Sequence, residues 1–163
     1  MHATDLTVAA VVHRNGRYLL VEERATNRIV ISQPGGHIED NESPEQAVVR
    51  EVCEETGCTV AVDDMIGVYY WMHPDTGRKY LRIIYAADFV DIDESRELDD
   101  GILRTHWLSR DELETCRKRH RSPSVMRCVL DFEAGRRKSH SLLSGMIPIE
   151  YSVERVLARA DQL

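Results

Sequence analysis

The tripeptide Pro34-Gly35-Gly36 stands just ahead of a segment that carries both the start and the stop signals of a helix. Ser43 is suited to cap the helix N-terminus, and Gln46 three residues later completes a capping box. Pro44 fits the first turn, where its missing N–H has no intrahelical partner to lose, and Gly57 fits the C-terminal cap. The chain is therefore committed to a tight turn that leads directly into one short helix.

Three carboxylates fall in the last two turns of that helix, where acidic side chains oppose the helix dipole and repel one another. At about 100° per residue, Glu51, Glu54 and Glu55 share one arc. That arc lies beside the apolar stripe that Val48 and Val52 would pack against a sheet. One interpretation is a solvated acidic face. The other is a bound hard cation, since Mg²⁺ suits carboxylates that share a site with phosphates, and the glycine turn lets backbone approach a ligand closely.

Six apolar or β-branched runs predict strands, and two tight turns join four of them into hairpins. Asn15-Gly16 predicts the first hairpin and Pro74-Asp75-Thr76-Gly77 the second. Ser109 opens a second capping box, and Ser122 opens a further helix that ends near Gly135. The predicted strands are Leu6–Arg14, Tyr18–Glu22, Arg28–Ser32, Val60–Met72, Lys79–Val90 and Ile102–Leu108. Strands and helices that mix without strict alternation favour a layered α/β or α+β domain.

Length and charge limit the class of protein. The chain has 163 residues and a formal net charge of −7, which argues against non-specific binding to nucleic acid or to an anionic membrane. Its apolar runs are too short to span a bilayer, and the first residues lack the features of a secretory leader, so we expect a cytoplasmic protein. We expect residues 1–143 to form one domain and residues 144–163 a weakly patterned C-terminal tail without an assigned role. The cysteines lack metal-ligand spacing and are expected to be reduced thiols; they are Cys53, Cys58, Cys116 and Cys128.

The turn and helix together resemble the Nudix box. The matching residues are Gly36, Glu42, Arg50 and then Glu51-Val-Cys-Glu-Glu-Thr-Gly57. Cys58 departs from the pattern, because an aliphatic residue is usual there. Seven fixed identities, each at about 7% usage, would coincide roughly once in a million chains. The resemblance is therefore specific.

Resemblance to the Nudix hydrolases implies an α/β fold, the Nudix fold, which is an α/β/α sandwich with a mixed β-sheet. It also implies Mg²⁺-dependent hydrolysis of a phosphoanhydride, with Mn²⁺ as an alternative ion. By the same resemblance Glu51, Glu54 and Glu55 hold the metal together with the Gly35 carbonyl, and Arg50 joins them in the catalytic set. Glu51 is favoured to assist the attacking water, either directly or through the metal. The structural residues of the box are Gly36, Glu42 and Gly57, and the resemblance implies that Glu42 pairs with Arg50 to orient the loop and helix.

Similarity beyond the box, over roughly residues 6–143, is to bacterial Nudix phosphatases. These enzymes release phosphate from nucleoside di- and triphosphates and from thiamine-type pyrophosphates such as hydroxymethylpyrimidine pyrophosphate. The segments that carry the similarity are Thr7-Val-Ala-Ala-Val-Val-His-Arg-Asn-Gly16, Leu19-Leu-Val-Glu-Glu23, Gln33-Pro34, Trp71-Met-His-Pro-Asp75, Tyr80-Leu-Arg82, His106-Trp-Leu-Ser109 and Arg121-Ser-Pro123. A small-molecule phosphate substrate is therefore expected.

Two alternatives stay open. Pro74 lies near the position of a proline marker in Nudix ADP-ribose pyrophosphatases, although the Asp75-Thr76-Gly77 that follows gives it the context of a turn. A non-catalytic Nudix module is the other alternative, but such modules tend to lose box carboxylates, and all are present here.

Several residues outside the box are further candidates for the site. The acidic stretch Asp88–Gly101 is either a solvated charge run or the source of a late acidic ligand, for which the candidates are Glu97, Asp99 and Asp100. Arg82 is a candidate for a phosphate contact, and Trp71 for stacking on a base or pyrimidine. One arginine of the two basic clusters, Arg117–Arg121 and Arg136–Lys138, is an equal candidate for the phosphate contact. The sequence does not choose between them, and it does not indicate an oligomeric state.

Overall fold

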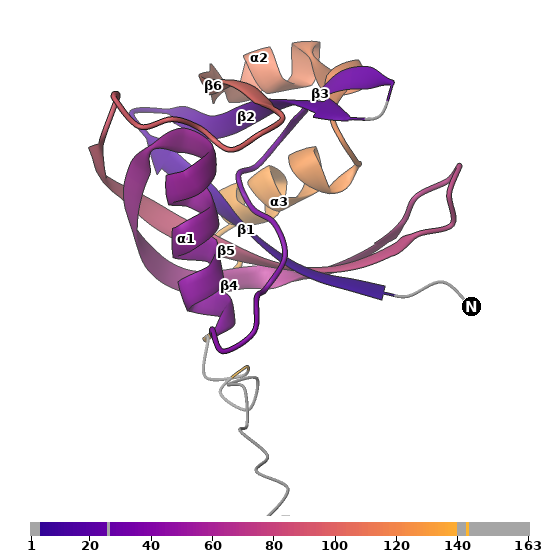
Figure 1. The fold of residues 1–163 in the computed structure, drawn as a ribbon, viewed down its shortest axis with the longest axis horizontal. Coiled ribbons are helices and arrows are strands. Elements are labelled where there is room, and N and C mark those ends of the chain that lie inside the picture. Colours follow the sequence, from indigo (N-terminus) through magenta and orange to yellow (C-terminus); the bar gives the residue numbers. More distant parts are fainter. Residues whose placement is uncertain (1–3, 26, 140–142, 144–163) are drawn as a thin grey trace, which may run out of the picture.

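The computed structural model describes residues 4–25, 27–139 and 143. Its centre is a mixed sheet, with α1 over one face and α3 over the other (Figure 1). The strands are β1 (Thr4–Arg14), β2 (Arg17–Ala25), β3 (Arg28–Ser32), β4 (Cys58–Met72), β5 (Lys79–Ile92) and β6 (Ile102–Ser109). The helices are α1 (Pro44–Thr56), α2 (Arg110–Thr115), the 3-10 turn η1 (Arg117–Arg119) and α3 (Ser124–Glu133). The predicted α/β/α sandwich with a mixed sheet is confirmed.

The strand order is β3-β2-β1-β5-β4, and β6 pairs with β2. β1 and β5 are parallel, whereas the other pairs are antiparallel. β1 and β2 pair only at their shared hairpin, from His13 opposite Tyr18 to Arg14 opposite Arg17. Beyond that point β2 pairs with β3 instead of β1, while β6 pairs with its other edge from Arg17 to Glu23. Along most of its length, the edge of β1 that faces away from β5 therefore has no paired strand in the described part of the chain. The candidate site forms along this edge.

The alternation of β1 separates two cores. Val8, Ala10 and Val12 pack in the layer that contains α1, and Ala9 and Val11 pack in the layer that contains α3. Each strand residue points to the opposite face from its neighbour, so one apolar run supplies both layers. The sheet is consequently buried on both faces, and its long central strands hold the loops at their ends in fixed positions.

The predicted helix signals and hairpins are confirmed. Ser43 and Gln46 form a capping box at α1, and Gly57 ends that helix in the left-handed conformation. One boundary is corrected: β5 continues to Ile92 in register with β4, so the acidic loop begins at Asp93 and not at Asp88. All four cysteines are free. No helix in the described part of the chain is long and apolar enough to cross a membrane. The predicted tail, residues 144–163, lies outside the described residues.

Candidate active site

The Pro-Gly-Gly loop occupies the open edge of β1. Val8 N–H donates to the Gly36 carbonyl (2.9 Å), and Ala10 N–H donates to the Pro34 carbonyl (3.1 Å). Gly35 has a φ of 151°, and a Cβ there would lie 2.2 Å from the Val8 carbonyl oxygen. Only glycine fits so close an approach. The loop is therefore held by strand-type hydrogen bonds and presents its peptide groups to the end of α1.

Two glutamates of α1 contact this loop directly. The Gly35 N–H donates to the Glu55 carboxylate (2.8 Å). The Glu51 carboxylate lies against Gly36, where a Cβ would be 2.5 Å from Oε1. Burial, together with the nearby charges of Glu23 and Glu51, raises the pKa of Glu55 to about 8 against the opposing hydrogen bond from Gly35. Burial also raises the pKa of Glu51, against the opposing effect of Arg50. Both carboxylates thus lack full compensation for their negative charge.

Arg50 joins the loop to the helix. Its guanidinium donates two hydrogen bonds to Glu42 (3.0 and 2.7 Å) and one to the His37 carbonyl (3.0 Å). Its Nη1 lies between Glu51 (3.0 Å) and Glu54 (2.9 Å). The predicted pairing of Arg50 with Glu42 is therefore present. All these contacts are to protein groups, so the geometry favours an orienting role for Arg50 over direct contact with substrate.

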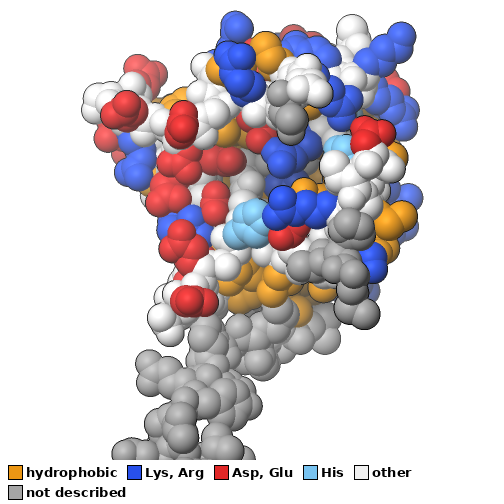
Figure 2. All heavy atoms as spheres, turned by 45° about the vertical axis from the view of Figure 1, so that its right-hand side comes forward, with side chains coloured by type: hydrophobic (Ala, Val, Ile, Leu, Met, Phe, Trp, Pro, Cys, Tyr) orange, Lys and Arg blue, Asp and Glu red, His pale blue; other side chains and the backbone are white. Residues whose placement is uncertain are grey.

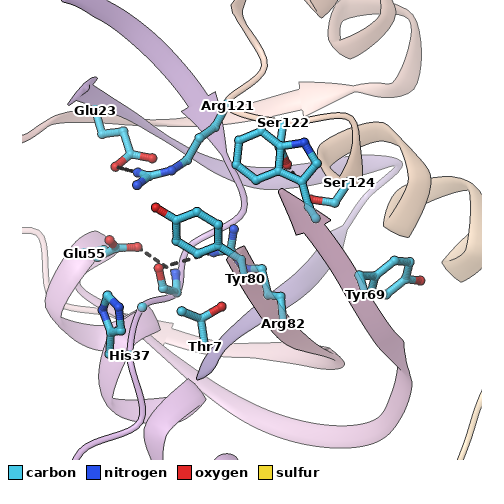
Figure 3. Close-up of a pocket in the computed structure, with 13 residues that line it drawn as sticks. Thr7, Glu23, His37, Glu55, Tyr69, Tyr80, Arg82, Arg121, Ser122 and Ser124 are labelled. Carbon is cyan, nitrogen blue, oxygen red and sulfur yellow. Dashed lines mark hydrogen bonds and ion pairs between the residues drawn. The ribbon is translucent and has the colours of Figure 1, made fainter. Parts of the chain in front are cut away.

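A cavity of about 220 Å³ opens beside the loop and Glu55 (Figure 3). Across it lies Arg82 of β5, whose Nη2 donates to the Gly35 carbonyl (3.3 Å). The Arg82 side chain keeps some exposure to the cavity, but its Nε is shielded from solvent and has no hydrogen-bond partner in the described part of the chain. The hydroxyl of Thr7, on β1, is likewise shielded from solvent and has no hydrogen-bond partner among the described residues. Buried polar groups are nearly always paired, so both are explained if a polar ligand completes this wall.

Arg121 and an aromatic pair complete the cavity. Arg121 forms an ion pair with Glu23 of β2, and its N–H donates to the Ile31 carbonyl (2.9 Å). Trp71 and Tyr80 stack with ring centroids 5.6 Å apart and an angle of 26° between their planes. Figure 3 shows Tyr80 and Arg82 projecting between Glu23 and Thr7. The cavity thus combines cations with a flat apolar surface, the groups that bind phosphate and an aromatic ring.

Comparison with models of known protein families shows which family contains this loop and helix. A family model described as "NUDIX domain" matches residues 3–129. The chain belongs to the Nudix family. It is 32% identical over 137 residues to the phosphatase NudJ of Escherichia coli K12, which covers 84% of this chain and 88% of NudJ. It is therefore an enzyme of the Nudix hydrolase type, which acts on phosphoanhydrides and generally uses a divalent metal.

Solved Nudix structures support the same fold. A NUDIX hydrolase from Nitrosomonas europaea superposes with a TM-score of 0.82 at 39% identity, over 92% of this chain and 98% of that one. An ADP-ribose pyrophosphatase from Streptococcus suis has a TM-score of 0.60 at 20% identity, over 82% of this chain and 93% of that one. The second likeness is one of fold alone.

The acidic loop brings one of the three candidate late acids to the Nudix helix. The Asp99 N–H donates to the Glu54 carbonyl (3.1 Å), and the charge of Asp99 contributes to the raised pKa of Glu51. In the described part of the chain, no hydrogen bond or ion pair joins Glu97 or Asp100 to the glutamates of α1. The structure therefore favours Asp99 over the other two.

The donor atoms of the Nudix helix suit a hard cation, although they are not gathered around one point. Among residues 4–25, 27–139 and 143, no group of three or more His, Cys, Asp or Glu side chains is arranged to hold a metal ion. The cause is visible: Arg50 separates Glu51 from Glu54, and Glu55 turns to the Gly35 amide. Buried carboxylates with raised pKa values are nevertheless the groups that a divalent cation would stabilise. These residues would fit the ion if Arg50 moved away from Glu51 and Glu54.

The structure brings Arg82 and Trp71, the predicted substrate contacts, to the cavity, together with residues that sequence reasoning did not single out. Glu23, Thr7 and Tyr80 lie on different strands, and nothing in their local sequence shows that they face one space. Arg121 belonged to the predicted basic cluster without being singled out. The available signal was that all four fall inside the segments similar to bacterial Nudix phosphatases.

Proposed function

We propose that this Nudix hydrolase is a Mg²⁺-dependent enzyme that cleaves nucleoside di- and triphosphates and thiamine-type pyrophosphates with release of phosphate. The observation that carries the proposal is the division of the site into two walls. Acidic side chains gather on one side of the hollow and basic side chains on the other (Figure 2). A phosphoanhydride between them would meet a metal-binding wall and a cationic wall at once. The 32% identity to NudJ, named a phosphatase, supports the release of phosphate.

In this proposal Glu51, Glu54 and Glu55 hold Mg²⁺, with Asp99 as the late acid and the Gly35 carbonyl as a further oxygen donor. When bound, the ion neutralises phosphate charge and lowers the pKa of the attacking water. Mn²⁺ is expected to substitute for it. Glu51 would assist the attacking water, either directly as a base or through the metal.

The opposite wall binds and orients the substrate. Arg82 and Arg121 donate to the oxygens of the phosphates, and the free Nε of Arg82 gains its missing acceptor. Donors that are fixed before the reaction stabilise developing negative charge without rearranging. Trp71 and Tyr80 stack on the base or pyrimidine ring. Arg50 and Glu42 hold the loop and helix in register, and Gly57 ends the helix where the acidic loop docks.

An ADP-ribose pyrophosphatase is the second candidate, on account of Pro74. That residue opens the turn between β4 and β5, as its sequence context predicts. It also lines a groove with Trp71 and Arg121 at the outer side of the cavity. In this second candidate, Pro74 would contact a substrate that extends past Trp71.

We propose further that residues 1–143 are the catalytic domain and that residues 144–163 are a tail outside it. The match to the Nudix family over residues 3–129 supports this division. Four free thiols support a cytoplasmic location, because reducing compartments preserve them.

A substrate panel read for phosphate, pyrophosphate and AMP tests the function. The panel contains nucleoside di- and triphosphates, ADP-ribose, thiamine pyrophosphate and hydroxymethylpyrimidine pyrophosphate, each with Mg²⁺, with Mn²⁺ and with EDTA. The expected result is phosphate from the diphosphates and from the pyrimidine pyrophosphate, and no turnover in EDTA. AMP from ADP-ribose, formed faster than phosphate from any diphosphate, would favour the second candidate. Nucleotide binding without turnover would reject both.

A further inference from the structure

The inner cavity is too small to enclose a complete nucleotide substrate. Its volume is about 220 Å³, whereas sites for small-molecule ligands usually enclose roughly 300 to 1,000 Å³. A groove of about 690 Å³ adjoins it. The two spaces share a wall made of Glu23, Trp71, Tyr80 and Arg121. A substrate whose phosphates occupy the inner cavity therefore extends into this outer groove.

Two hairpins form the sides of the outer groove. Arg24 and Arg28 come from the β2–β3 hairpin, and His73 and Arg78 come from the β4–β5 hairpin. Both hairpins project on the same side of the molecule (Figure 1). Their basic side chains stand beyond the hollow, on the side opposite the acidic helix (Figure 2). The groove is thus a continuation of the cationic wall.

The arginines of the groove differ in their partners. Arg78 forms an ion pair with Asp5, and Arg121 forms one with Glu23. In the described part of the chain, Arg24 and Arg28 have neither an acidic partner nor a side-chain hydrogen bond, and both are exposed. The two carboxylates that line the groove are therefore already neutralised, and the excess positive charge comes from Arg24 and Arg28. In a chain of net charge −7, this local excess faces the substrate path.

We propose that the outer groove binds a second anionic group, a phosphate on the part of the substrate remote from the reacting phosphates, and that Arg24 and Arg28 are the specificity-determining residues. The inference rests on the proposed function, because it assumes that the reacting phosphates lie in the inner cavity. Exposed guanidinium groups bind phosphate by charge-assisted, bidentate hydrogen bonds. Substrates with a remote phosphate are then selected through KM, since the contact is equal in the ground state and the transition state.

A matched pair of substrates tests this proposal. The pair is adenosine 5′-diphosphate with and without a phosphate on its ribose 3′ oxygen. With the unaltered chain at low ionic strength, the 3′-phosphate is expected to lower KM roughly 10-fold with kcat unchanged. The difference should shrink as salt is raised, because the contacting arginines are exposed. In the Arg24→Gln/Arg28→Gln double variant, the two KM values should become equal.

Two controls separate this contact from general electrostatics and from misfolding. Lys118→Gln removes an exposed positive charge of η1 outside the groove and should preserve the 10-fold difference. Arg28→Lys with Arg24 intact should retain most of it, since the charge remains. Equal KM values for the two substrates in the unaltered chain, or the same loss in Lys118→Gln, would overturn the proposal. Absence of turnover on both substrates would instead mean that the proposed function has failed.

Discussion

The two walls of the site are built in opposite ways. The acidic wall comes from the contiguous segment 33–58, where hydrogen bonds between Gly35 and Glu55 and between Arg50 and Glu42 close over short distances along the chain. The cationic wall is assembled from β1, β2, β4, β5 and Arg121, which lies between η1 and α3. Arg121 and Glu23, which pair across it, are 98 positions apart. The acidic wall is thus a local unit, whereas the cationic wall exists only in the folded sheet.

The walls also differ in how many of their polar groups have hydrogen-bond partners within the protein. Arg50 donates to three carboxylates and a carbonyl, so the acidic wall is crowded with internal contacts. On the other wall, Arg82 Nε and the Thr7 hydroxyl are buried without partners in the described part of the chain. The comparison teaches that the protein's own contacts fix the acidic wall, although its carboxylates are not gathered around one point, whereas the substrate completes the cationic wall. This predicts that changes to the acidic wall affect kcat, and that changes to the cationic wall affect substrate recognition.

The largest expected effect is that of Glu55→Gln. We expect kcat to fall on the order of 1,000-fold, because the amide removes a charge needed to hold the metal and to balance the phosphates. The fold should remain intact or gain slight stability, since repulsion among the box carboxylates decreases. Steady-state phosphate release and thermal unfolding in the same buffer check both statements. Glu94→Gln, an exposed acid of the nearby loop, is the matched control and should keep full activity. A near-normal rate for Glu55→Gln in Mg²⁺ would remove this glutamate from the metal site.

The metal-free stability of the protein should depend on pH through the same residue. Burial raises the pKa of Glu55 from an ordinary value of 4.5 to about 8, so the folded state binds a proton that the unfolded state has released. The contribution is fully present below pH 4.5 and is lost as pH rises through 8. In EDTA, the free energy of unfolding should therefore fall by about 3 kcal/mol between pH 5 and pH 8.

Denaturant unfolding of the unaltered chain and of Glu55→Gln across this range measures the contribution. The difference between the two curves cancels groups that titrate in both, among them His120, whose pKa burial lowers. Added Mg²⁺ should abolish the fall, because the cation stabilises the ionised carboxylate. If the free energy of unfolding changed with pH in the same way for both proteins in EDTA, the raised pKa would not belong to Glu55.

The same contrast between walls explains what could be predicted from the sequence. The capping box of Ser43 and Gln46, the left-handed Gly57 and the pairing of Arg50 with Glu42 are all fixed by neighbours within one turn or one loop. Signals of this kind are readable without knowledge of the sheet. The local framework of the acidic wall could therefore be predicted, whereas the choice of Asp99 among the late acids and the contacts of Arg50 with Glu51 and Glu54 needed the structure.

The cationic wall could not be predicted in the same way. Period-two alternation tells which face a strand residue occupies, but not which strand lies beside it. β2 leaves β1 after two residue pairs and pairs with β3 instead. Because the Arg121 N–H donates to Ile31 of β3, this change of partner brings Arg121 next to Glu23. The end of β5 was misplaced for a related reason, since acidic residues such as Asp91 lower strand propensity and yet pair with β4. Long-range pairing overrode the local pattern in both cases.

Arg82→Gln should have the next largest effect on catalysis. Hydrogen bonds to charged groups contribute about 1.5 to 3 kcal/mol, so kcat/KM is expected to fall roughly 10- to 100-fold. Arg82→Lys keeps the charge but loses the buried Nε, so its kcat/KM should lie between that of the unaltered chain and that of Arg82→Gln. Phosphate release from a nucleoside diphosphate measures the change, and Arg14→Gln, a positive charge that stacks on Phe89 away from the cavity, is the control. If Arg82→Gln matched the control, the unpaired Nε would need another explanation than a substrate phosphate.

The smallest predicted effect tests the aromatic part of the cationic wall. Trp71→Leu removes the surface that stacks on Tyr80 and faces the cavity. Aromatic pairs contribute about 0.5 to 1.5 kcal/mol beyond simple burial, so KM for a nucleoside diphosphate should rise roughly 3- to 10-fold with kcat unchanged. Tyr70→Leu is the matched control, because it alters the adjacent residue of β4, which is 62% exposed and does not line the cavity. Inhibition by inorganic pyrophosphate, which lacks a ring, should be equal in both variants. A parallel loss of pyrophosphate binding in Trp71→Leu would mean that Trp71 shapes the phosphate site itself rather than stacking on the base.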